Sequence, residues 1–377
     1  MITAPKYAVE LRLNGVLIGD VRELAQDLVW ARRRTKCGVD SIDFTLNDVL
    51  FAEWCEQRGT TIAEMLKPLA LDCRVIRDGV AVVGGFLATM PAYSPNQTSA
   101  NLAMKFDGYT NLLAGVFIGP AGTQNGRMGA LVSNWITMAD SRASSAGKAF
   151  GFRAGDIDAM ASVEQTFDNY KSVKDAIADR CDNTSGAGQF DLYWDVDRTY
   201  NVYKDSNFGD KIADYTIRYP ASLNGVSATS ISASEVAGFA SSIIAVGAGE
   251  ISSDSSKNTA ITYKTTNSAA VAEYGYAETM YQESSISQMA TLQRNAQTEL
   301  KNALDMRWQP EITLTGRQVI PAPVSSGKIW LGDSVMINNR ADATGTTNGK
   351  FRVNELEVKV SASNAEEIRP KLERVDG

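Results

Sequence analysis

The chemistry open to this chain is limited by what its 377 residues lack. The sequence contains no histidine. A Ser-His-Asp or Cys-His nucleophile and an H-E-x-x-H zinc site are therefore excluded. The phosphate-binding pattern G-x-x-x-x-G-K-[ST] is also absent, and no G-x-G-x-x-G follows an expected strand. No cofactor is expected.

Carboxylates are the remaining candidates for acid–base chemistry. Asp191, Asp195 and Asp197 gather around one expected hairpin, and Asp156 and Asp158 precede a helix-like stretch. A glycosidase needs two carboxylates at a set separation. Aspartates in turns and helix caps are the common alternative. The run from Asp195 to Asp197 also partly matches a calcium loop, but it lacks the glycine and the distal glutamate of an EF-hand.

The four cysteines do not have metal-site spacing. They are Cys37, Cys55, Cys73 and Cys181, and none forms a C-x-x-C pair. A structural zinc would have to gather all four thiolates from scattered positions. We expect buried free thiols in a protein made in the cytosol, and no bound metal.

One basic cluster stands out at Arg32, Arg33 and Arg34, followed by Lys36. It could contact nucleic acid or an acidic neighbouring subunit, or it could be the solvated end of a strand. We treat the three arginines as interface candidates that pair with carboxylates of a neighbouring chain, because the guanidinium group matches a carboxylate in geometry. We expect no continuous arginine ring facing a pore.

Composition and charge narrow the class of protein. The chain is 44% hydrophobic, which suits folded cores, and its length favours two to four domains. No apolar run is long enough to span a membrane, and the first residues, Met1 to Tyr7, lack an apolar signal-peptide core, so no secretory signal is expected. The net charge of −7 argues against tight binding of duplex DNA. A channel through which nucleic acid slides remains compatible with it.

The first 108 residues follow a β pattern. Apolar and polar residues alternate over 7–13, and Asn14-Gly15 then gives a strong hairpin signal. Further strands are expected at 41–46, 72–86 and 102–106, with short helices inserted between 49 and 66. These features predict a small antiparallel barrel or sandwich over residues 1–108.

The expected secondary structure and the composition change twice in the middle of the chain. Residues 109–205 combine two expected helices, 128–143 and 170–181, with an aromatic hairpin at 189–203, which predicts an α+β unit. Residues 206–306 begin with a strand ending at Tyr219 and are then rich in Ser, Ala, Thr and Gly over 221–272. That stretch could be a linker, but its apolar run at 243–249 favours a folded, β-rich segment with a loose loop near 252–257.

The last hundred residues hold the clearest pattern. Residues 285–304 carry one apolar face at helical spacing, formed by Ile286, Met289, Leu292, Ala296, Leu300 and Leu304. Strands are expected at 311–315, on both sides of Gly332-Asp333, and over 349–360. The alternation slips near Asn354–Glu355, which predicts a β-bulge. Residues 307–377 are therefore expected to form a second barrel.

The order of these pieces resembles the baseplate hub, or tail-associated, proteins of long-tailed bacteriophages and related particles. The residues that carry the resemblance are Tyr274-Gly275-Tyr276-Ala277-Glu278 before the helix, Gly332-Asp333, Gly349-Lys350-Phe351-Arg352-Val353, Gly84 to Leu87, Tyr93 with the loop 94–99, and Gly108 to Leu113. The resemblance implies an α+β fold that is mainly β, with two tail-tube-like antiparallel barrels and α+β insertions. The implied domains are the first barrel (1–108), an α+β insertion (109–205), a second β-rich and helical domain (206–306) and the C-terminal barrel (307–377).

The resemblance also implies a function. A homotrimer would join the six-fold tail tube to a three-fold tip and form part of the channel for DNA ejection. Its partners would be a distal tail or tube ring, the end of the tape measure, and a tip spike or fibre, with DNA passing without sequence-specific binding. Such a protein is a virion component assembled in the host cytoplasm. The chain ends near its last expected strand, where many relatives continue into an enzymatic extension, so no enzymatic activity is implied.

Two other functions stay open from the residues alone. One is a carbohydrate-active enzyme of the cell envelope that uses aspartates. The other is a Ser/Thr-rich surface adhesin of phage type.

Overall fold

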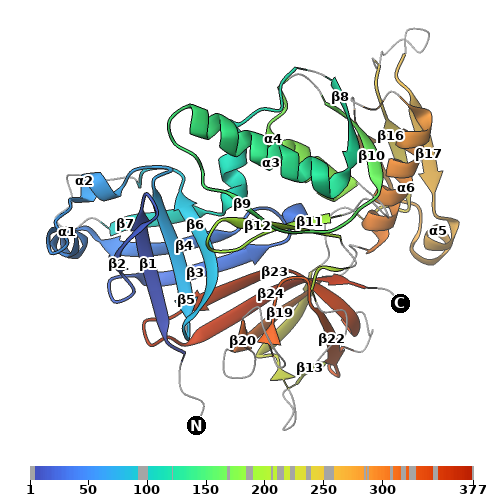
Figure 1. Ribbon diagram of the computed structural model, residues 1–377. Coiled ribbons are helices and arrows are strands. Elements are labelled where there is room, and N and C mark those ends of the chain that lie inside the picture. The colour runs from blue at the N-terminus through green and yellow to red at the C-terminus, as the bar shows by residue number, and fades with distance from the viewer. Residues whose placement is uncertain are drawn as a thin grey trace.

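The structure is a computed structural model of the chain. It describes residues 5–91, 101–120, 122–167, 170–183, 190–204, 207–209, 216–220, 226–234, 239–249, 259–283, 286, 288–305, 309–315, 320–321, 328–342 and 347–375. A large β-sheet assembly carries an α+β insertion on one side and a smaller helix-and-sheet unit at one end (Figure 1). The loops predicted at 94–99 and 252–257, and Tyr93, lie outside the described residues.

The first part of the chain forms the predicted antiparallel strands. Their order in the sheet is β3-β4-β7-β6-β5-β1-β2. They are β1 (Tyr7–Leu13), β2 (Val16–Asp20), β3 (Gln26–Arg33), β4 (Ser41–Asn47), β5 (Leu71–Arg77), β6 (Val80–Leu87) and β7 (Asn101–Asp107).

Local sequence signals explain how these strands are connected. Asn14 and Gly15 both have positive φ, 52° and 82°, as the tight turn between β1 and β2 requires. Asn47 caps helix α1 (Asp48–Glu56), and Thr61 forms a capping box with Glu64 at the start of α2 (Ile62–Met65). These short helices lie at one end of the molecule (Figure 1).

The insertion has the predicted helix and aromatic hairpin. Its core packs α3 and α4 against the hairpin β11–β12, and it lies on one side of the large sheet (Figure 1). The unpredicted strand β9 pairs in parallel with β12. The elements are η2 (Tyr109–Gly115), β8 (Gly122–Arg127), α3 (Met128–Ser145), β9 (Arg153–Ile157), β10 (Ser162–Phe167), α4 (Val173–Asn183), β11 (Phe190–Trp194) and β12 (Thr199–Lys204).

The last part of the chain forms a second group of strands. It also includes three strands from 216–234, two of which, β13 and β14, make parallel pairs. The strands are β13 (Thr216–Tyr219), β14 (Val226–Ser227), β15 (Ser230–Ser234), β19 (Gln309–Thr315), β22 (Ser334–Asn339), β23 (Gly349–Val360) and β24 (Glu366–Arg374), with a small separate pair, β20 (Ile320–Pro321) and β21 (Lys328–Ile329).

Among the described strands, one pairing joins the two groups. Residues 355–360 of β23 pair antiparallel with residues 28–33 of β3, so 14 strands form one connected sheet. One hydrophobic core includes side chains from both groups, among them Trp30 and Trp330 with ring centroids 6.4 Å apart. The predicted fold class, mainly β with α+β insertions, is confirmed. The two predicted barrel regions, however, share a sheet and a core.

The predicted bulge in β23 is present. The register of β23 against β24 shifts between Val353 and Glu355. On its other edge, β23 pairs with β22 before this point and with β3 after it. The bulge therefore marks the place where β23 changes its neighbour.

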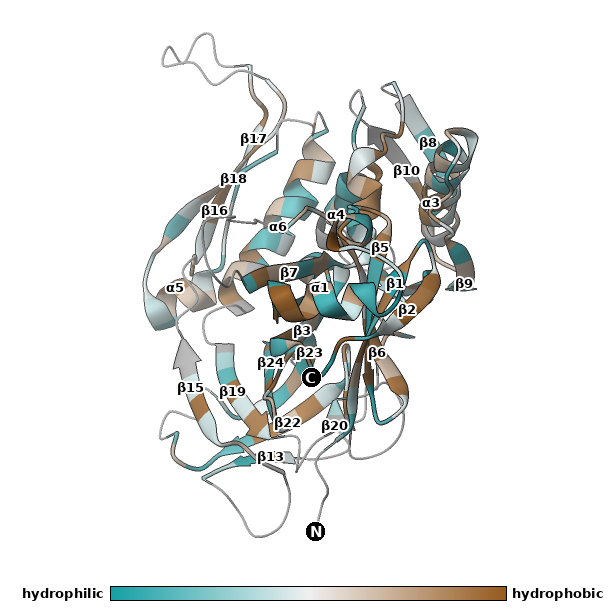
Figure 2. Ribbon diagram, turned by 90° about the vertical axis from the view of Figure 1, so that its left-hand side faces the viewer, coloured by the Kyte–Doolittle hydropathy of each residue, from teal (hydrophilic) through white to brown (hydrophobic). Residues whose placement is uncertain are grey.

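A third unit packs α6 (Met289–Asp305) on a three-stranded sheet at the end of the molecule (Figure 2). Leu292, Ala296 and Leu300 are buried, as predicted for the helix face. The prediction was wrong for Met289, which is the first residue of the helix and is 41% exposed. The other elements are β16 (Ser242–Val246), β17 (Thr262–Thr266), α5 (Ser268–Tyr274) and β18 (Glu278–Gln282).

The cysteines form no disulfide, but they are not all buried as expected. Cys55, Cys73 and Cys181 are buried, whereas Cys37 is exposed. Cys37 ends the 3-10 turn η1 (Thr35–Cys37), which follows β3 and has no buried residue. In the described part of the chain, no helix is both long and apolar enough to cross a membrane.

Candidate functional site

Arg32 and Arg33 are the last residues of β3, and Arg34 follows them, where the N-terminal strands, the insertion and the C-terminal strands meet. Successive side chains in an extended chain point to opposite faces of a sheet, so these arginines contact different neighbours. Arg32 and Arg34 are buried, with 1% and 4% exposure, and Arg33 is half-buried. We call this cluster the arginine junction.

Arg32 connects three parts of the fold through one guanidinium group. Its Nη1 lies 3.0 Å from Oδ2 of Asp40, and its Nη2 donates to the carbonyl oxygen of Trp194 at 2.9 Å. The guanidinium carbon lies 4.4 Å from the ring centroid of Tyr193 and 5.7 Å from that of Trp330. A planar cation between aromatic rings is favourable when water is excluded.

Arg33 points to the other side of the sheet and pairs with the C-terminal strands. Its Nε lies 3.0 Å from Oε1 of Glu355, and its main-chain N–H donates to Oδ1 of Asp40 at 2.7 Å. Glu355 is only 3% exposed and also pairs with Lys371 at 2.8 Å. Two cations therefore compensate this buried carboxylate.

Arg34 holds the insertion hairpin. Its Nε and Nη2 donate to the carboxylate of Asp191 at 3.0 and 2.6 Å, a two-pronged pair in which both side chains are almost fully buried. Its Nη1 donates to Oδ1 of Asn354 at 3.0 Å. One side chain thus joins β11 to the bulge of β23.

Lys36 and Glu373 form the partly exposed edge of the junction. Lys36 Nζ donates to Glu373 at 2.5 Å, and Asn354 donates to the same oxygen at 2.8 Å. Burial alone would raise the pKa of Glu373, but Lys36, Asn354 and Arg34 outweigh it and lower that pKa.

A second polar cluster fixes the opposite end of the β23–β24 hairpin. Arg77 donates to both carboxylate oxygens of Glu366, at 2.6 and 3.0 Å, and the hydroxyl of Tyr7 donates to Glu366 at 2.5 Å. Arg22 donates to the carbonyl oxygen of Ser361 at 2.7 Å and to Oδ1 of Asn364 at 2.9 Å. The C-terminal hairpin is therefore tied to the N-terminal strands at both ends.

The candidate carboxylates of the insertion have structural partners. Asp191 binds Arg34, as described above, and Asp195 accepts a hydrogen bond from Asn201 at 3.0 Å. Asp197 accepts from the main chain of Thr199 at 3.2 Å, within the β11–β12 turn. Asp158 accepts from the main chain of Lys204 at 2.7 Å, whereas the side chain of Asp156 is exposed.

No metal site is built from these groups. Among the described residues, no group of three or more cysteine, aspartate or glutamate side chains is arranged to hold a metal ion. The aspartates of the hairpin hold a turn and an arginine, which are the contacts expected of structural carboxylates.

The arginines were recognised from sequence, but their partners were not. Asp40, Asp191, Glu355 and Glu373 all belong to the same chain as the arginines. The one usable signal was the slip in alternation at Asn354, which marks where Arg34 binds. The expected role of Arg32, Arg33 and Arg34 in contacts with a neighbouring chain stays a prediction.

Comparison with known proteins places this fold in one class. Three solved phage tail proteins share it over almost their whole length, each at 13% sequence identity. The 43 kDa tail protein of prophage MuSo2 from Shewanella oneidensis matches with a TM-score of 0.64, over 97% of this chain and 98% of that chain. A tail protein from Neisseria meningitidis matches with a TM-score of 0.61, over 98% and 96%. A prophage tail protein from Listeria monocytogenes matches with a TM-score of 0.55, over 97% and 94%.

Part of the sequence also matches a known protein family. Residues 214–369 match the family described as "Prophage endopeptidase tail". Among curated proteins, none matches the chain. The resemblance to phage tail proteins that the sequence suggested is thus confirmed, and the chain has the fold of a phage tail protein.

Proposed function

We propose that this chain is a structural virion protein, the trimeric hub of a baseplate or tail tip. The observation that carries the proposal is the shared fold with tail proteins over almost the whole of both chains. The hub would join the six-fold tail tube to a three-fold tip and form part of the channel for DNA ejection.

The structure supports this role through the connection between its two strand groups. In the proposed trimer, each chain would contribute both groups to one ring. The pairing of β3 with β23, the shared core and the clusters at both ends of the β23–β24 hairpin fix the two groups relative to each other. A protein that holds a channel closed until a trigger needs this kind of rigid connection.

The partners we propose are a distal tail or tube ring on one face and a tip spike or fibre on the other, with the end of the tape measure inside. DNA would pass without sequence-specific binding. One similar structure is the PdpA–VgrG complex of Francisella, with a TM-score of 0.52, in which the matched chain is part of an assembly with another protein. We propose assembly in the host cytoplasm and residence in the virion.

We also propose the division 1–108, 109–205, 206–306 and 307–377 as the domains of the hub. The insertion and the unit around α6 each have a core of their own. The first and last domains share the largest core. Strands β13 to β15, in the third domain, pair within the sheet of the last domain.

The proposed function does not include catalysis. The family description contains the word endopeptidase, but it matches residues 214–369, and the candidate carboxylates Asp191 and Asp195 lie outside that range, in structural contacts. The check is an assay of the purified chain on peptidoglycan and on a peptide library. Turnover that is lost in Asp195→Asn or Asp197→Asn variants would overturn this part of the proposal.

Oligomeric mass tests the hub directly. Light scattering of the purified chain should give three times the chain mass of 40.7 kDa, or a larger complex when a tube protein is added. A monomer that stays monomeric at high concentration and with tube protein would count against the hub.

A further inference from the structure

Four asparagines in the chain are followed directly by glycine. Asn14-Gly15, Asn125-Gly126 and Asn348-Gly349 lie in the described part of the chain, and Asn224-Gly225 lies outside it. This dipeptide loses ammonia more readily than other asparagine pairs, because glycine has no side chain to hinder attack by its main-chain nitrogen on the preceding amide. The three described pairs share the dipeptide, so their surroundings in the fold decide which of them reacts.

The pair at the tip of the β1–β2 hairpin is open to this reaction. Asn14 and Gly15 are both exposed, and a Cβ added to Gly15 would meet no atom within 4 Å. Among the described residues, none accepts a hydrogen bond from the main-chain N–H of Gly15. The attacking nitrogen can therefore lose its proton to solvent and approach the amide without displacing a neighbour.

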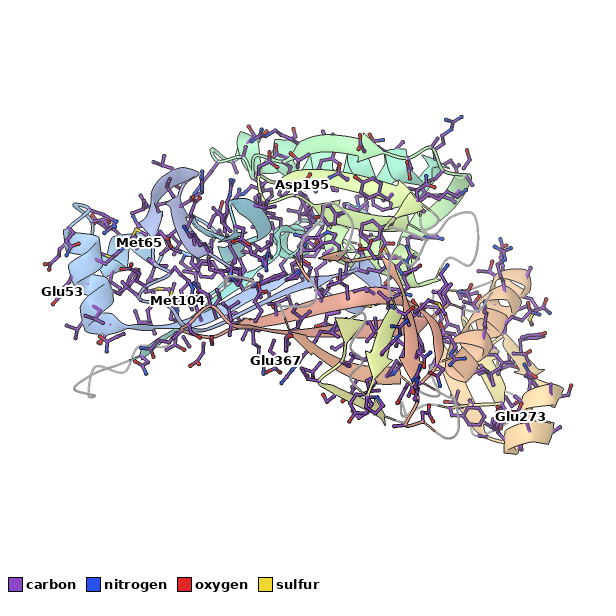
Figure 3. The ribbon with its side chains drawn as sticks, turned by 90° about the horizontal axis from the view of Figure 1, so that it is seen from below. Glu53, Met65, Met104, Asp195, Glu273 and Glu367 are labelled. Carbon is purple, nitrogen blue, oxygen red and sulfur yellow. The ribbon has the colours of Figure 1, made fainter. Side chains whose placement is uncertain are left out.

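A lysine of the insertion contacts the amide that is attacked. Figure 3 shows the insertion, marked by Asp195, on one side of the β3 and β23 ribbons and Glu367 on the other. Lys148 follows α3 in this insertion, and its Nζ donates to Oδ1 of Asn14 at 2.6 Å. A carbonyl oxygen becomes negative when its carbon is attacked, and a cation bonded to that oxygen stabilises the charge. Lys148 therefore favours the reaction at this amide.

The other two described pairs are held by their neighbours. Asn125 lies within β8 and pairs with Glu164 of β10. Ring closure requires rotation about the Cα–C bond of the asparagine, which a strand ladder resists more than the exposed tip of a hairpin does. The amide of Asn348 is bound at both ends by the main chain of Asn339, whose N–H donates to Oδ1 at 2.6 Å and whose carbonyl oxygen accepts from Nδ2 at 3.2 Å.

We propose that Asn14 is a site of spontaneous deamidation and that Lys148 promotes the reaction. The main-chain nitrogen of Gly15 forms a bond to Cγ of Asn14, the Cγ–Nδ2 bond breaks, and the proton of the attacking nitrogen leaves with the amide as ammonia. Water then opens the resulting succinimide at either carbonyl, which gives aspartate or isoaspartate at position 14. No oxidant, cofactor or second chain takes part.

Deamidation changes the contact between the hairpin and the insertion. A carboxylate beside Lys148 converts a hydrogen bond into an ion pair, and the net charge of the chain changes from −7 to −8 (−7 − 1). Isoaspartate also lengthens the main chain of a two-residue turn by one carbon, which disturbs the pairing of Leu13 with Val16 beside the tip. Because the loss of ammonia is irreversible in water, the modified form accumulates with the age of the chain.

The test compares three asparagines of the same folded chain. The purified protein is incubated at neutral pH in oxygen-18 water, which labels the product because its new oxygen comes from the solvent, and is then digested for mass spectrometry. We expect Asn14 to react first, while Asn125 and Asn348 stay unlabelled. In denaturant the three asparagines should react at similar rates, since the fold is what distinguishes them.

Variants of Lys148 test the role of the lysine. Lys148→Met keeps the length of the side chain, removes its charge and should slow the reaction at Asn14 roughly two- to fivefold, the range for an exposed charged contact. Lys148→Arg keeps a charged donor and should restore the rate. Lys174→Met is the matched control: Lys174 Nζ also donates to an asparagine oxygen, Oδ1 of Asn111, at 2.6 Å, and its loss should leave the rate at Asn14 unchanged. Circular dichroism checks that each variant keeps the fold.

Two results would overturn the proposal. One is equal labelling of the three asparagines in the folded wild type. The other is a folded Lys148→Met variant that reacts at Asn14 as fast as the wild type or faster, because the lysine then restrains the amide instead of polarising it.

Discussion

Arg34 and Asn354 contact each other twice. The main-chain N–H of Arg34 donates to the carbonyl oxygen of Asn354 at 2.9 Å, and its guanidinium group donates to Oδ1 of the same residue at 3.0 Å. Asn354 lies in the bulge where β23 changes its partner from β22 to β3. The bulge interrupts the ladder, and Arg34 supplies hydrogen bonds at the interruption.

Replacing Arg34 with alanine should destabilise the protein strongly. Asp191, with 2% exposure, would lose its two-pronged partner and keep a buried charge. Breaking a buried pair in this way costs about 3–5 kcal/mol. Arg34→Lys keeps the charge but loses the planar geometry, so an intermediate loss is expected. Denaturant unfolding followed by circular dichroism measures both.

The matched control is Arg153→Ala. Arg153 lies 3.8 Å from Asp197, and the two side chains are 68% and 42% exposed. An exposed pair of this kind contributes about 0–1 kcal/mol. Equal losses in the Arg34 and Arg153 variants would show that the arginine junction does not hold the fold together.

Replacing Leu300 with aspartate should disrupt the unit around α6. The side chain lies in a small apolar core with Leu292 and Ala296. A charge placed there without a partner costs at least several kcal/mol, or the group stays protonated. We expect insoluble protein, or fast hydrogen exchange confined to residues 242–305. Lys301→Asp, one residue further along on the exposed side, should leave exchange unchanged.

Glu373 should make the stability depend on pH in the acidic range. Its pKa is lowered in the folded protein, so it stabilises the fold above the pKa of the unfolded state, about 4.3. That contribution is lost as the pH falls through the folded pKa. Because its side chain is 42% exposed, the effect should stay below about 1 kcal/mol. Thermal melting of wild type and Glu373→Gln should differ at pH 7 and converge near pH 3.

One thiol in each chain should react in the native protein. Cys37 is exposed, while Cys55, Cys73 and Cys181 are buried. Desolvation raises the pKa of the Cys37 thiol to about 11 although the residue is exposed, so little of it is thiolate at pH 7. A maleimide reagent should therefore label one site slowly without denaturant and four after unfolding, and Cys37→Ser should abolish the native reaction. Labelling of a second site in the native state would contradict the described packing.

Local features of the fold were predictable because their causes are local. The turn at Asn14-Gly15, the helix face of α6 and the bulge at Asn354 each follow from neighbouring residues. The pairing of β3 with β23 was not predicted, since its strands lie about 320 residues apart and alternation does not identify a partner. For the same reason the arginines were found, but Asp191 was read as a possible catalytic group.

The pairing of β3 with β23 also has a consequence during synthesis. The edge of β3 is completed only when residues 355–360 leave the ribosome. Translation at about 5–20 residues per second makes the nascent chain wait roughly 15–60 s for that strand. During this interval the edge of β3 is open to pairing with other nascent chains. The N-terminal sheet should therefore depend on chaperones until translation ends, and chains truncated before residue 349 should aggregate.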